Sequence, residues 1–153
     1  LTVEQIGRLR RIINPFHLKY LGLSRIRGMD SSLLLKLLEK MPQLSILSVW
    51  QDDLIKYIHD SKLCEQLKKM VKRLYVEGRE DYDLFKRDQF YEVFRNIEHF
   101  QFEASGREDL FFSLSCLPKL STLQAKWVAV DDPKWYIPRI QNELNKQNVI
   151  YDI

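Results

Sequence analysis

The sequence has few of the residues from which small catalytic and redox sites are made. Its 153 residues include only five glycines, so there is little material for a phosphate-binding loop. Neither a Gly-x-Ser-x-Gly nucleophile motif nor a Cys/His arrangement with recognisable spacing occurs. Cys64 and Cys116 lie far apart and outside any Cys-x-x-Cys pair, which indicates reduced, structural cysteines in the cytosol or nucleus.

Long apolar runs and a large excess of one charge are also missing. No apolar stretch approaches the roughly 20 residues of a membrane-spanning helix, and residues 1–5 lack the basic flank and apolar centre of a signal peptide. The 24 Lys and Arg are interleaved with 21 Asp and Glu, and the net charge of +3 disfavours nucleic acid as a partner. We therefore expect a soluble intracellular protein, cytoplasmic or nuclear, without membrane contact.

The remaining candidates for metal binding or acid–base chemistry have ordinary structural interpretations. His59 and Cys64 are five residues apart, which differs from the i, i+4 spacing of a metal site on a helix. The carboxylates within residues 80–83 belong to a charged connector, and the basic residues 68–73 span the expected end of a helix, where cations complement the helix dipole. We expect a non-enzymatic protein with no catalytic residue, metal or cofactor.

What the sequence does contain is one strand motif, apolar-x-x-apolar-x-apolar, repeated five times. Its first position recurs with steps of 26, 27, 26 and 23 residues, and a period of this size is typical of a solenoid. With 45% hydrophobic residues, the chain has enough apolar material for the core of a single domain spanning residues 1–153. The copies occupy residues 18–23, 44–49, 71–76, 97–102 and 120–125.

Helical patterns separate the strand motifs. Asp30 is a candidate N-cap for a helix with apolar residues at i, i+3, i+4 and i+7 from Leu34 to Met41, and Asp52–Asp53 is a candidate cap for the next. A charged connector at 78–88 precedes another apolar face from Phe90 to Ile97. A capping box is expected at 105–108. The domain then divides into a capping helix at 1–14, five repeats at about 18–130, and a closing helix and strand at 131–153.

The repeated unit predicts an α/β fold in which neighbouring strands form a parallel sheet. The first, fourth and sixth motif positions are apolar and should face the helices, so the intervening residues should face away from them. Helices are wider than strands, so stacking bends the array into a short horseshoe with a concave open face. The alternatives are an α/β enzyme or regulatory domain with a two-sided sheet, which needs apolar intervening residues, and a weak RNA-binding module.

The motif and its spacing resemble leucine-rich repeats of the longer, helix-bearing subclass. The units at 41–47 and 117–123, with their Pro-x-Leu-x-x-Leu cores, are similar to the irregular repeats that follow an F-box in ubiquitin-ligase substrate receptors. That resemblance implies a substrate-recognition arm and, through an F-box missing ahead of Leu1, a ubiquitin-ligase adaptor as a partner. The Asn or Cys expected three residues after each strand is replaced by Ile26, Asp52, Arg79, Ser105 and Val128.

The side chains of the open face are the predicted partner-binding site. They include Tyr, Trp and Arg, the types that dominate binding hot spots. A packing role on the flanking loops is the alternative for Trp50 and Tyr75. We expect the open face to hold an unidentified protein without chemistry of its own. The predicted contact residues are Tyr20, Trp50, Arg73, Tyr75, His99, Gln101 and Gln124.

Overall fold

The computed structural model describes residues 15–78, 88–104, 115–127, 145 and 150–152 of the chain. The expected capping helix at 1–14, the capping box at 105–108 and most of the closing segment at 131–153 lie outside these residues. A short 3₁₀ helix, η1 (Pro15–His17), leads into the first strand.

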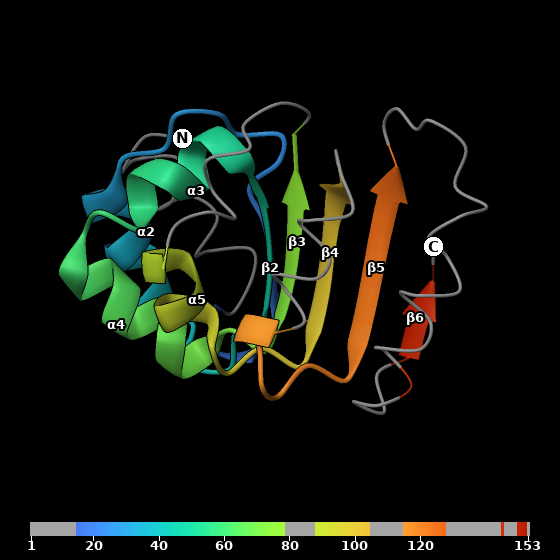
Figure 1. Cartoon of the computed structure of the whole chain (residues 1–153). Helices are drawn as coiled ribbons and strands as arrows, with labels where there is room; N and C mark the ends of the chain where they lie inside the picture. The colour runs from blue at the N-terminus through green and yellow to red at the C-terminus, as the bar shows by residue number, and fades with distance from the viewer. Residues whose placement is uncertain (1–14, 79–87, 105–114, 128–144, 146–149, 153) are drawn as a thin grey trace.

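Six strands form one parallel sheet in the order of the sequence (Figure 1). Each strand therefore pairs with the next one along the chain, as expected for stacked repeats. The pairing keeps equivalent motif positions side by side, for example Leu47 with Leu74 and Leu74 with Phe100. The strands are β1 (Tyr20–Gly22), β2 (Ile46–Trp50), β3 (Arg73–Glu77), β4 (His99–Ala104), β5 (Thr122–Trp127) and β6 (Ile150–Asp152).

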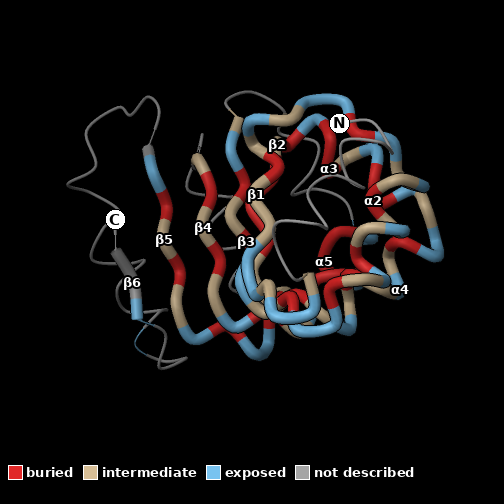
Figure 2. Tube along the Cα trace, turned by 180° about the vertical axis from the view of Figure 1, so that it is seen from behind, coloured by how far each residue is buried: buried red, intermediate tan, exposed pale blue. Residues whose placement is uncertain are grey.

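The four described α-helices lie together on one side of the sheet (Figures 1 and 2). Helix α2 contacts α4, and α4 contacts α5, so these three form a row beneath the strands. The two-sided sheet required by the enzyme alternative is not seen in the described part of the chain. The helices are α2 (Ser31–Leu38), α3 (Gln51–Tyr57), α4 (Ser61–Met70) and α5 (Asp88–Phe94).

Burial alternates along β3, β4 and β5 as the motif predicts, whereas in β2 the outward-facing Ser48 is also buried. In β3, Leu74 and Val76 are buried, whereas Arg73 and Glu77 are exposed and Tyr75 is half-buried. The same inward positions of β2, β4 and β5 are buried beneath the helices. The core also holds the ring of Phe90 against those of three other aromatic residues, with centroid separations of 5.0, 5.1 and 5.8 Å. Those residues are Tyr91, Phe94 and Phe100.

Main-chain hydrogen bonds at the amino end of the strands hold the repeats in register. The carbonyl of Ser45 accepts from the N–H groups of Lys72 and Arg73, at 2.8 and 3.0 Å. The carbonyl of Lys72 accepts from Glu98 and His99 in the same way, at 2.8 and 3.1 Å. Equivalent pairs link the first repeat to the second and the fourth to the fifth. The carbonyl at the second motif position thus links each repeat to the next. These are backbone hydrogen bonds, so they require no particular side chain.

Of the two helix caps predicted at Asp30 and Asp52–Asp53, the structure confirms the first and contradicts the second. The Asp30 carboxylate accepts from the N–H of Ser32 at 3.0 Å, which confirms it as the N-cap of α2. Helix α3 begins directly after β2, and its N-cap residue is Trp50, which makes no side-chain capping bond. The expected cap at Asp52–Asp53 is therefore wrong. Both aspartates lie in the first turn, where the helix dipole favours them, and Asp53 faces a neighbouring loop instead.

Candidate functional site: the open face of the sheet

The open face consists of the side chains that strands β1 to β5 turn away from the helices. They stand in three rows that cross the strands. The parallel register pairs all neighbours in the first two rows. In the third row it pairs only Trp50 with Glu77 and Glu103 with Lys126, and Ser24 belongs to the turn after β1. The first row, at the amino end of the strands, contains Tyr20, Ile46, Arg73, His99 and Thr122. The second contains Gly22, Ser48, Tyr75, Gln101 and Gln124. The third, at the carboxyl end, contains Ser24, Trp50, Glu77, Glu103 and Lys126.

Tyr20 covers one edge of this face. Its side chain folds over Gly22, two residues further along β1, and a Cβ at Gly22 would meet the Tyr20 hydroxyl at 2.7 Å. Glycine at this position therefore lets the ring lie flat along the strand. Tyr20 nevertheless remains 54% exposed, so its ring is available to a partner.

Four polar side chains at the centre of the face form what we call the donor patch: Arg73, Tyr75, His99 and Gln101. Arg73 lies opposite His99, and Tyr75 lies opposite Gln101, on the adjacent strands β3 and β4. Partial burial lowers the pKa of His99, and the nearby Arg73 guanidinium is the second cause of this shift. The His99 ring is therefore neutral at pH 7. Every member of the donor patch can offer an N–H or O–H group.

Carboxylates follow one row further along the same two strands. Glu77 is exposed and accepts a hydrogen bond from the Ser48 hydroxyl at 3.2 Å. Glu103 is half-buried, and its Oε2 atom is buried with no hydrogen-bond partner among the described residues. Lys126 stands opposite Glu103 in the register and is exposed. We call Glu77 and Glu103 the acidic row.

Trp50 is fixed by three neighbours at the carboxyl end of the sheet. Its indole N–H donates to the carbonyl of Ser24, and the Arg27 guanidinium lies 4.2 Å from its ring centroid. Gly78, at a φ of +133°, brings its backbone against the ring edge, where a Cβ would lie 3.3 Å from Trp50 Cε3. The indole therefore packs on flanking loops, which was the alternative to a direct binding role, and only part of its surface is left for a partner.

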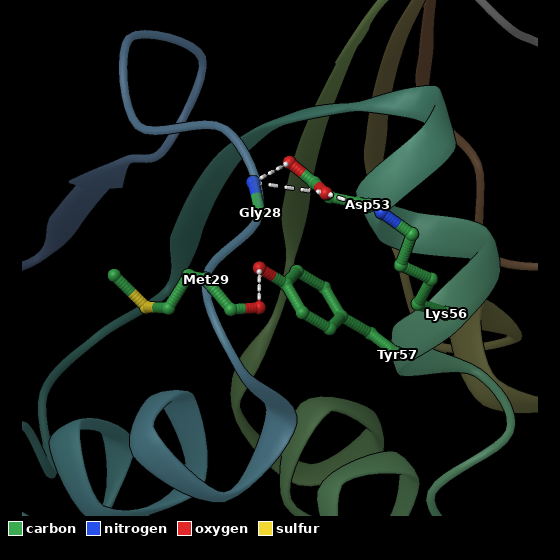
Figure 3. Close-up of polar contacts among 5 residues, drawn as sticks. All are labelled: Gly28, Met29, Asp53, Lys56 and Tyr57. Atoms are coloured by element: carbon green, nitrogen blue, oxygen red, sulfur yellow. Dashed lines mark hydrogen bonds and ion pairs between the residues drawn. The ribbon is translucent and has the colours of Figure 1, made fainter. Parts of the chain in front are cut away.

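Two buried side chains of α3, Asp53 and Tyr57, hold the loop that carries Arg27 through hydrogen bonds to Gly28 and Met29 (Figure 3). We call these two contacts the latch. The Asp53 carboxylate accepts from the Gly28 N–H with both oxygens, at 3.2 and 3.1 Å, and its side chain is only 5% exposed. Lys56 lies 3.3 Å from the same carboxylate. One turn further along α3, the Tyr57 hydroxyl donates to the carbonyl of Met29 at 3.1 Å. Helix α3 thus fixes the β1–α2 loop, and with it the position of Arg27 over Trp50.

The Tyr57 hydroxyl gives the latch a pH dependence. Burial, with Asp53 and Asp30 nearby, raises the pKa of Tyr57 to about 12, above its ordinary value of 10. Because the folded pKa is the higher one, this contribution to stability is complete below pH 10 and is lost as the pH rises toward 12. We expect Tyr57→Phe to lower the free energy of unfolding by about 1–2 kcal/mol at pH 7. Urea unfolding at pH 7 and pH 10.5 should show a smaller difference between wild type and Tyr57→Phe at the higher pH; an unchanged difference would contradict the assignment.

The other sequence candidates lie away from the open face. Lys68 and Lys69 occupy the last turn of α4, and Lys68 lies 4.0 Å from Glu92. The Cys64 thiol donates to the carbonyl of Ile58 at 3.2 Å, and burial raises its pKa, which is typical of an unreactive cysteine. In the described residues no group of three His, Cys, Asp or Glu side chains could hold a metal ion, and no helix is both long and apolar enough to span a membrane.

Sequence reasoning locates the rows of the open face but misses the latch. The face follows from the two-residue alternation of the strands, which is a local property. The sequence predicts Asp53 only as a helix cap, because its contact with Gly28 joins residues 25 positions apart in the chain. A pair of acidic residues at the start of α3, where one would suffice, is the signal that could have suggested a second role.

The fold and the open face together define an α/β domain with a sequentially ordered parallel sheet covered by helices on one side. This arrangement is similar to that of a solved Caenorhabditis elegans structure described as a tropomodulin C-terminal domain. The TM-score is 0.51 at 14% sequence identity, and the match covers 97% of this chain and 92% of that chain. No protein-family model and no curated protein matches the sequence. At this identity the likeness shows the fold alone.

The structural comparison corrects the F-box resemblance. The units at 41–47 and 117–123 suggest repeats of a ubiquitin-ligase substrate receptor, but the similar solved fold is a tropomodulin domain, so that interpretation is wrong. A proline before the strand motif ends the preceding helix in any repeat of this shape, and it does not distinguish F-box proteins from others. The ubiquitin-ligase adaptor expected as a partner on the same ground is likewise unsupported.

Proposed function

We propose that this chain is a non-catalytic protein-binding module, built as a short leucine-rich-repeat solenoid, that holds its partner on the open face. The observation that carries the proposal is the alternation along β3 and β4, where buried apolar residues alternate with the Arg73, Tyr75, His99 and Gln101 side chains. A sheet covered by helices on one side leaves its other side available to a partner. Tyr and Arg side chains combine a large contact area with polar groups that can form hydrogen bonds.

The composition of the open face supports binding over chemistry. Its polar groups are spread across five strands, and no hydrogen bond joins the Tyr75 hydroxyl to the His99 ring in the donor patch. The strands already fix the backbone beneath these side chains, so binding costs side-chain rotamer entropy but little backbone entropy. The wide, pre-organised surface therefore suits recognition of another protein.

An affinity capture from native extract tests the proposal. The double variant Arg73→Ala/Tyr75→Ala is preferred to one at Trp50, because the side chains of Arg73 and Tyr75 make no hydrogen bond to the described part of the fold, whereas the Trp50 side chain contacts two loops. We expect this variant to lose at least one protein that wild type retains, since hot-spot truncations cost about 2 kcal/mol or more each.

The matched control is Lys62→Ala/Lys69→Ala, which removes exposed side chains from α4 on the helical side. It should capture the same proteins as wild type. Loss of the same proteins from both double variants, or from neither, would contradict the assignment of binding to the open face. Thermal unfolding of both variants checks that each remains folded.

A further inference from the structure

Hydrogen-bond donors and carboxylates occupy opposite ends of the open face along the direction of the strands. The donor patch offers Arg73 and three other donors, with no carboxylate in its two rows on β3 or β4. The acidic row follows at the carboxyl ends of the same strands. Arg73 and Glu77 are four residues apart on β3, as are His99 and Glu103 on β4, so the two regions are separated by about 13 Å at the rise of a strand.

Among the described residues, each region contains a charged group that lacks a hydrogen-bond or ion-pair partner for at least one of its atoms. In the described part of the chain the Arg73 guanidinium forms no ion pair or hydrogen bond, although it is exposed and stands among other donors. The buried Oε2 atom of Glu103 likewise has no partner there, and a buried carboxylate oxygen without a donor is costly. An incoming carboxylate would pair with Arg73, and an incoming cation would pair with the exposed Glu77 carboxylate and offset the negative charge of Glu103.

We propose that the open face binds an extended protein segment that carries an Asp or Glu and a Lys or Arg four residues apart, the carboxylate over the donor patch and the cation over the acidic row. This inference rests on the proposed function and names the chemistry of the partner. The guanidinium of Arg73 takes a carboxylate with two parallel hydrogen bonds, and the hydroxyl of Tyr75 and amide of Gln101 are placed to add others.

The separation of the two regions favours an extended segment over a helix. In an extended chain, residues i and i+4 project to the same side and lie about 13 Å apart. In a helix the residues that share a face are i and i+3, i+4, i+7 or i+8, at about 4.5, 6, 10.5 and 12 Å, so the spacing of an extended chain is the closest match. Tyr20 and Ile46, in the first row beside Arg73, extend the contact with apolar surface.

Selection from a library of random 12-residue peptides displayed on phage tests the spacing and the signs. Wild type is expected to enrich peptides with one acidic and one basic residue four positions apart. Arg73→Glu makes both regions negative and should enrich peptides with two cations at that spacing. Glu77→Arg places a cation beside the remaining Glu103 carboxylate and should reduce the enrichment of the basic residue. A synthetic peptide enriched on wild type should bind Arg73→Glu at least about tenfold more weakly, because a charge-assisted contact becomes a repulsion.

Charge-matched controls lie on the helical side of the domain. Lys62→Glu and Glu65→Arg change the net charge of the protein by the same amounts at exposed positions of α4, and both should select the wild-type pattern. Four outcomes would overturn the proposal: enriched peptides without opposite charges four apart, the same peptides selected by wild type and Arg73→Glu, a shift in pattern produced equally by the controls, or no enrichment on wild type.

The two proposals fail separately. If the Arg73→Ala/Tyr75→Ala variant loses captured proteins but the selection shows no charge spacing, the open face remains a binding surface and only the chemistry of the partner is wrong. If the capture is insensitive to that variant, the binding function itself is wrong. Circular dichroism at equal concentrations verifies that each charge variant is folded, since exposed substitutions usually alter stability by less than about 0.5 kcal/mol.

Discussion

Phe90→Ala is expected to lower the free energy of unfolding by about 3–5 kcal/mol, a large share of the stability of a single domain. Phe90 is fully buried on α5, and its ring lies between other aromatic rings of the same helix and Phe100 of β4. Truncation removes its buried apolar area and leaves a cavity between the helix layer and the sheet. A rigid sheet cannot close such a cavity without moving its hydrogen-bonded strands.

Urea unfolding followed by circular dichroism measures this loss, with Glu92→Ala as the control. Glu92 lies two residues along the same helix but is exposed, and its ion pair with Lys68 is long, at 4.0 Å. The control should change stability by less than about 1 kcal/mol. A cost below about 1.5 kcal/mol for Phe90→Ala would contradict the placement of its ring in the core.

Asp53→Ala is expected to cost about 1.5–3 kcal/mol, because hydrogen bonds that involve a charged group contribute more than neutral ones. The carboxylate is buried and accepts from the Gly28 N–H with both oxygens. Its removal leaves that N–H without its acceptor, so that the Tyr57–Met29 hydrogen bond remains as the contact of α3 with the β1–α2 loop. Gly28 has a φ of +72°, a conformation that glycine adopts readily.

Asp52→Ala is the matched control for Asp53→Ala. It removes an identical carboxylate from the preceding position in the same first turn, but Asp52 is exposed. The control therefore loses only the helix-dipole contribution, about 0.3–1 kcal/mol. Equal costs for the two variants would show that the latch contributes nothing beyond the dipole. Tryptophan fluorescence, to which Trp50 contributes with two other tryptophans, adds a second readout, because a loosened loop moves Arg27 away from the Trp50 ring.

The latch and the open face are linked through the first two repeats. Asp53 and Tyr57 hold the backbone of Gly28 and Met29, and the adjacent Arg27 stacks on Trp50 at the carboxyl end of β2. Trp50 therefore contributes to the shape of the open face by fixing its border. Variants at Trp50 would disturb both the border and the loop, so they report less cleanly on binding than variants at Arg73 and Tyr75.

The strand motif by itself determined the order of the sheet and the side to which each strand residue points. The reason is physical: a strand alternates its side chains with a period of two, and repeats of similar length stack with equivalent positions in register. Leu74 and Val76 could thus be assigned to the core, and Arg73 and Tyr75 to the open face, from their positions in the motif alone. Asp30 as a helix cap was equally local, since its acceptor and donor are two residues apart.

Only the tertiary structure decided which side chains are already engaged by the fold and which remain available. The contacts of Asp53 with Gly28, of Tyr57 with Met29 and of Trp50 with Ser24 join residues 25 to 28 positions apart. Each depends on how one loop folds over the next repeat, and no periodic pattern encodes that. For the same reason the guanidinium of Arg73, unpaired among the described residues, and the buried oxygen of Glu103 became apparent only when neighbouring strands were side by side.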